Sequence, residues 1–166
     1  MNADAFRHLY AYHFAQNRAL WDLAAQLSDE AFDKPGPYSQ GSVRHQVMHL
    51  LAVDEGWFTE LRHDPWPEDI GPDAPMPTPM RDQIRERWDD VERRMREYLD
   101  GLRDGALGEH PWDEGEDKDL LCWQVLIHVV NHATDHRAQT LRQLADLGVK
   151  TYPQDYVFYA YEHPVG

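Results

Sequence analysis

The chain has 166 residues, with 16 Lys and Arg against 30 Asp and Glu, ten His and one Cys. This length suits one domain with its own core, and a hydrophobic fraction of 42% argues against disorder. The formal charge of −14 argues against a nucleic-acid partner or an anionic membrane surface, because both bind mainly Lys and Arg. A single Cys excludes an internal disulfide and fits a reducing compartment.

Two features of the chain bear on its location. Its first eight residues lack the basic region and apolar run of a signal segment. No stretch approaches the roughly 18 apolar residues of a membrane span. We therefore expect a soluble, cytoplasmic protein that forms one domain over residues 1–166.

Apolar residues recur at helical spacing in four long segments. These predicted helices cover residues 5–27, 42–62, 78–102 and 119–147. Ser42 and Thr78 stand at favoured N-cap positions, Pro79 suits a first helical position, and Gly148 suits a helix end. Residues 28–37 are interpreted as a break, and no alternation is long enough to predict a sheet.

The connections between these segments predict a topology. The first is short, which suits antiparallel neighbours, whereas the second, residues 64–79, holds six Pro and suits a crossover along a bundle. We therefore predict an all-α fold, an up-down-down-up four-helix bundle with a long crossover between helices 2 and 3. The aromatic tail, residues 149–166, is expected to pack on the bundle or to form a dimer contact.

Three histidines follow one another at helical spacing in the last predicted helix. His128, His132 and His136 are four residues apart, so they share a helix face about 80° wide. Two His at this spacing can bind one metal ion, as in the helical zinc motif of metalloproteases. Ala133 stands where that motif has its Glu, so a protease mechanism is not supported.

The second predicted helix supplies a third candidate ligand. His49 flanks its apolar face, and we predict that it joins His132 and His136 in holding one ion. In that register, His45 and His128 are each displaced by one turn, about 5.4 Å. The alternative for such a pair is core histidines bonded to Asp, Thr or the backbone.

Six further residues are candidates to orient these ligands or to line a pocket beside them. They are His45, Glu55, His128, Asn131, Asp135 and Arg137. Arg137 could hold an anionic substrate group, although a surface ion pair is its simpler interpretation. Cys122 lies about 15 Å along the helix from His132 and is predicted to be a buried thiol.

Two segments resemble a known family. Residues 128–139, His-Val-Val-Asn-His-Ala-Thr-Asp-His-Arg-Ala-Gln, are similar to the last-helix signature of the DinB/YfiT-like family. Residues 41–58, with Gly-Ser-Val, then His-Leu, then Trp-Phe, are similar to its second-helix element. The likeness covers nearly the whole chain in the same order, and Ala138 departs from a frequent Gly without touching the ligands.

The resemblance implies a fold and a metal. It implies an up-down-down-up four-helix bundle, often homodimeric, with a divalent ion, commonly nickel or zinc, on three His that match His49, His132 and His136. It implies no DNA binding, because the family is named for damage-inducible expression.

The resemblance leaves several activities open. Characterised relatives include bacillithiol S-transferases and a mycothiol-dependent maleylpyruvate isomerase. We therefore predict a metal-dependent enzyme that activates a low-molecular-weight thiol for S-transfer to a small electrophile. The alternatives are a hydrolase that uses metal-bound water, or a stress-related metal-binding protein without catalysis.

Overall fold

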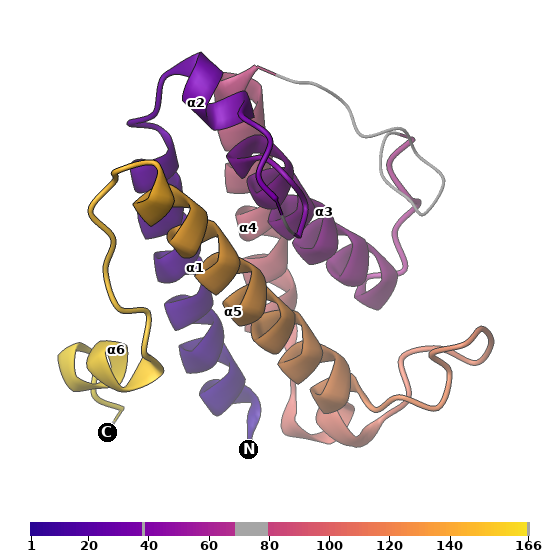
Figure 1. The fold of residues 1–166 in the computed structure, drawn as a ribbon. Coiled ribbons are helices and arrows are strands. Elements are labelled where there is room, and N and C mark those ends of the chain that lie inside the picture. The colour runs from indigo at the N-terminus through magenta and orange to yellow at the C-terminus, as the bar shows by residue number, and fades with distance from the viewer. Residues whose placement is uncertain (38, 69–79, 166) are drawn as a thin grey trace. The chain divides into compact units, whose positions relative to one another are not determined.

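The structure is a computed structural model, and it describes residues 1–37, 39–68 and 80–165. The described chain is all helical and contains no strand, which confirms the predicted fold class (Figure 1). Its elements are α1 (Ala3–Ala24), α2 (Asp29–Asp33), α3 (Val43–Leu61), α4 (Arg81–Gly101), the 3₁₀ helix η1 (Asp104–Gly108), α5 (Cys122–Asp146) and α6 (Tyr156–Glu162). The up-down-down-up course stays a prediction. No described helix has the length and apolar character needed to cross a membrane.

The ends of two predicted helices follow from local chemistry. Ser42 precedes α3, and its Oγ accepts a hydrogen bond from the backbone N–H of His45 at 3.2 Å, as an N-cap does. Gly148 follows α5 with φ of +85°, in the left-handed region that glycine adopts without a side-chain clash. The backbone N–H of Val149 then donates to Leu144 O at 3.0 Å and closes the helix.

Two predicted boundaries are wrong. Residues 28–37 are not simply a break, because Ser28 Oγ accepts from the N–H of Ala31 and starts the short helix α2, whose Phe32 is fully buried. Helix α4 begins at Arg81, and Met80 before it is extended. The predicted cap at Thr78 and most of the predicted crossover lie outside the described residues.

The chain divides into two compact units. The first comprises Met1–Arg7 and Leu51–Val129, and the second comprises His8–Leu50 and Val130–Gly166. The boundary falls within α1, α3 and α5, so each unit contains a part of these helices.

The first unit is built around α4. The buried face of this helix consists of Ile84, Trp88, Val91, Met95 and Leu99. The start of the chain is tied to the end of α4, because Arg7 donates to the carbonyl oxygens of Leu99 and Leu102 at 2.9 and 2.6 Å. Its exposed face carries i, i+4 ion pairs such as Arg93–Glu97, as expected for a solvated helix face.

The second unit fixes the C-terminal tail by hydrogen bonds from aromatic side chains. Tyr12 Oη donates to Gln154 O at 2.5 Å, and Tyr152 Oη donates to Gln16 O at 3.2 Å. The rings of Tyr156 and Tyr159 in α6 pack within 6 Å of Tyr12. The tail therefore lies against α1, and it contains a helix that the sequence interpretation did not predict.

Candidate metal centre

Three imidazoles of the second unit converge on one point. His49 comes from α3, and His132 and His136 come from successive turns of α5. Each offers one ring nitrogen, and these three atoms lie within 4.8 Å of one another. The structure thus brings together the three predicted ligands, and they could hold a metal ion.

The spacing of the nitrogens fits a transition-metal ion. Nε2 of His49 and Nε2 of His132 are 3.3 Å apart. In a tetrahedral site with metal–nitrogen distances of about 2.0–2.1 Å, two ligand atoms lie about 3.4 Å apart. All three side chains are half-buried, so one side of the site is accessible to a further ligand.

The protonation of the cluster also suits a metal. Burial, together with the charges of His136 and His132, lowers the pKa of His49 from 6.5 to about 4. Burial likewise lowers the pKa of His136, although the carboxylate of Asp135 opposes the shift. These two imidazoles are therefore neutral near pH 7, which is the form that binds a metal.

Gln46 supports one of the ligands and was not predicted. Its Oε1 lies 3.4 Å from Nδ1 of His136, and the Gln46 residue is 1% exposed. An Nδ1–H that donates to this oxygen leaves Nε2 of His136 with a free lone pair for a metal. Gln46 stands three residues before His49, so both lie on neighbouring positions of α3, a spacing from which the sequence could have suggested it.

Replacing Gln46 by Leu is expected to weaken metal binding by about 10–100-fold, because His136 loses the acceptor that orients its ring. Gln46→Glu retains an acceptor and should restore most of the affinity. The measurement is competition for zinc with a chromogenic chelator. Gln26→Leu, at an exposed site in the same unit, is the matched control, and equal affinities of the Gln46→Leu and Gln26→Leu variants would contradict this role.

The pH dependence of the metal-free protein follows from His49. Unfolded His49 takes up a proton near pH 6.5, whereas the folded residue does so only near 4. The unfolded state therefore binds more protons between these values, and the free energy of unfolding falls as the pH drops from about 6.5 toward 4. Urea unfolding in a chelator should show a weaker decline for His49→Phe than for wild type. The exposed His45→Phe should match wild type, and identical profiles of all three proteins would refute the assignment.

The remaining histidine candidates do not join the cluster. The group of three described above contains neither His45 nor His128. His45 is exposed near the start of α3, in the second unit. His128 is exposed in the first unit, where its ring centroid lies 5.2 Å from that of Trp57.

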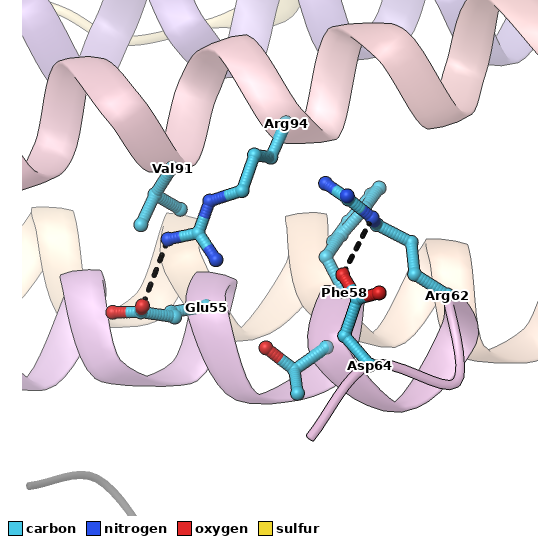
Figure 2. Close-up of a pocket in the computed structure, with 7 residues that line it drawn as sticks. Glu55, Phe58, Arg62, Asp64, Val91 and Arg94 are labelled. Atoms are coloured by element: carbon cyan, nitrogen blue, oxygen red, sulfur yellow. Dashed lines mark hydrogen bonds and ion pairs between the residues drawn. The ribbon is translucent and has the colours of Figure 1, made fainter. Parts of the chain in front are cut away.

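Glu55 lines a pocket of the first unit, where arginines bind its carboxylate. Its Oε2 accepts from Nε of Arg87 at 2.7 Å, and its Oε1 accepts from Nη2 of Arg94 at 2.9 Å. Figure 2 shows Glu55 on α3 and Arg94 on α4 reaching toward each other, with the Arg62–Asp64 ion pair beside them. The two arginines, rather than an imidazole, are thus the partners that orient Glu55.

The two polar candidates beside the ligands on α5 face outward. Asn131 and Asp135 are both exposed, and Asp135 accepts a hydrogen bond from the Gln139 side chain at 2.9 Å. The influence of Asp135 on the site is electrostatic, through its opposing effect on the pKa of His136.

The interpretation of Arg137 as a surface residue is wrong. Its side chain is fully buried in the second unit, where it bonds side chains of α1, of α5 and of the C-terminal tail. The acceptors are Asn17 Oδ1 at 2.9 Å, Thr134 Oγ1 and Gln154 Oε1, both at 3.1 Å, and His13 Nδ1 at 3.3 Å. Arg137 therefore holds the interior of this unit, and an anionic substrate group is not its partner in the structure.

The comparison with family models identifies the chain. The model of the DinB family matches residues 1–164, nearly the whole sequence. A comparison with curated proteins finds no match. The family match agrees with the all-helical chain and with the three converging histidines. The chain belongs to the DinB family.

Proposed function

We propose that this protein holds one divalent ion at His49, His132 and His136 and uses it to activate a low-molecular-weight thiol for S-transfer to a small electrophile. The observation that carries the proposal is the convergence of three imidazole nitrogens within 4.8 Å. Membership of the DinB family supports it. Nickel and zinc are the ions we favour, since both suit imidazole ligands.

The residues of the site suit such a reaction. Three neutral nitrogen ligands leave further coordination positions for a small molecule. A divalent ion there supplies Lewis acidity, which lowers the pKa of a bound thiol. In the overall reaction the thiol sulfur forms a bond to carbon, the leaving group departs with its electron pair, and the thiol proton passes to solvent.

The chain's own cysteine does not supply the sulfur in this scheme. Cys122 is buried, and its Sγ lies 3.5 Å from Tyr98 Oη in the first unit. Burial raises the pKa of the Cys122 thiol, so little thiolate forms near pH 7. The nucleophile must therefore come from a substrate thiol.

Three accompanying features belong to this proposal. We expect the four long helices to form the predicted bundle, two copies of the chain to form a homodimer, and the protein to act in the cytoplasm, where small thiols are kept reduced. Nucleic acid and membranes are not expected partners, given the charge of −14.

The test is a screen of small thiols with a chromogenic electrophile on metal-loaded protein. We expect turnover that requires thiol, metal and His132 together. Turnover that needs metal but no thiol would instead support the hydrolase, because metal ions also lower the pKa of water. Stoichiometric metal without turnover in any arm would favour the non-catalytic alternative.

A further inference from the structure

Three indole rings gather in the first unit, around the C-terminal part of α3. We call them the tryptophan cluster: Trp57 on α3, Trp66 just after it, and Trp112 in the loop before α5. The ring centroids of Trp57 and Trp112 are 6.0 Å apart, with planes inclined at 46°. On α5, the ring of His128 lies 5.2 Å from Trp57 at an angle of 67°.

One residue of α3 fixes the direction of two of these rings. Trp66 donates its indole N–H to the carboxylate of Glu60, and Trp112 donates its indole N–H to Glu60 O at 3.3 Å. Gly56 allows the close approach of Trp66, because a Cβ at that position would lie 3.0 Å from Cη2 of the indole. The polar edges of two indoles are thus satisfied by α3, and the rings interact through their faces.

The faces of this cluster remain accessible. Trp66 is 43% exposed, Trp57 and Trp112 are half-buried, and His128 is exposed. A core cluster would bury such rings, as Trp88 is buried in the same unit at 3% exposure. The rings therefore form a surface against which a small molecule can pack.

Geometry and charge both favour a cationic ligand. A cation binds over the faces of aromatic rings within about 6 Å of their centroids, and rings that share one cation are inclined to each other. Residues 109–119 around Trp112 contain six Asp and Glu against one Lys, and the carboxylate of Glu60 lies at the cluster itself. A neutral planar ring would gain nothing from these charges, whereas an organic cation gains from both.

We propose that the tryptophan cluster binds a small organic ammonium ion, such as a quaternary ammonium group, through cation–π contacts. Trp57 and Trp112 contact the alkyl groups with their ring faces, and Trp66 covers a further side. The carboxylates of residues 109–119 attract the charge from solution. This site does not depend on the metal or on the thiol reaction.

The chain carries its own controls for the test. It has six Trp, so six indole N–H signals are available in a ¹H–¹⁵N correlation spectrum. Titration with choline should shift the signals of Trp57, Trp66 and Trp112 in a saturable manner. Trp21 and Trp88 are buried, and Trp123, 41% exposed on α5, reports on nonspecific contact.

The neutral analogue of choline, 3,3-dimethyl-1-butanol, separates charge from shape. We expect it to bind more weakly than choline by about two- to fivefold or more at equal ionic strength. Equal shifts from both compounds, shifts of Trp123 as large as those of the cluster, or no saturation with choline would overturn the proposal.

Substitutions separate ring chemistry from packing. Trp112→Leu should weaken choline binding by about two- to fivefold, whereas Trp112→Phe, which keeps an aromatic face, should lose less. Trp123→Leu should leave binding unchanged. Unaltered thermal unfolding of the Trp112→Leu variant shows that it folds. Equal binding by Trp112→Leu and Trp123→Leu would count against the cluster as the site.

Discussion

Replacing His132 by Ala is expected to abolish stoichiometric binding of divalent metal, with a loss of affinity beyond the 10–100-fold that outer partners cause. The variant removes one of three nitrogens that lie within 4.8 Å of one another, and Nε2 of His49 loses its partner at 3.3 Å. Metal content measured by mass spectrometry after dialysis should fall from about one ion per chain to background.

The same substitution has a thermal signature. A ligand present at about 100 times its dissociation constant stabilises the folded state by about 2.7 kcal/mol, which raises Tm by about 5–10 °C in a chain of this size. Wild type should show this rise on adding nickel or zinc, and His132→Ala should not. His45→Ala, exposed on α3, is the control and should behave as wild type. Undiminished metal content in His132→Ala, or no metal in wild type under replete conditions, would refute the site.

Replacing Arg137 by Met is expected to destabilise the protein by about 2–5 kcal/mol. The guanidinium is fully buried and donates to side chains of α1, α5 and the tail. Its loss leaves the carbonyl oxygens of Asn17 and Gln154 without this donor, and each buried acceptor that loses its hydrogen bond costs about 1–3 kcal/mol. Thermal unfolding should show a fall in Tm of about 5–15 °C.

The matched control for this prediction is on the same helix. Arg142 carries a side chain that is 71% exposed and pairs with Asp146 at 3.1 Å. Arg142→Met should therefore change the free energy of unfolding by less than about 0.5 kcal/mol, as surface ion pairs contribute little. Similar unfolding curves for the two variants would show that the buried network around Arg137 carries no special stability.

The long helices were predictable because their signal is local. An apolar residue every three to four positions reports the helical period directly, and Ser42 and Gly148 mark ends through the chemistry of single residues. Helix α2 was missed because one turn is too short to show a period, and only the burial of Phe32 against other parts of its unit explains why it forms.

The ligand pair His132 and His136 was predictable for the same reason. Four residues along a helix correspond to one turn, so the two rings lie on one face whatever the helix packs against. His49 required a hypothesis about a second helix, and in the structure it lies where that hypothesis needed it.

Other features depended on contacts between distant segments. Sequence statistics place Arg at the surface, yet Arg137 is buried, because acceptors 17 to 124 residues away in sequence converge on it. Gln46 gained its role only through the approach of α3 to His136 across 90 positions.

The sequence by itself determined which segments are helical and which two histidines share a turn, because backbone hydrogen bonding and helical periodicity act over a few residues. The tertiary structure decided which polar side chains serve the site and which serve the interior. Arg137, Gln46 and Glu55 all have partners far away in the chain, and burial alone makes those partners energetically necessary.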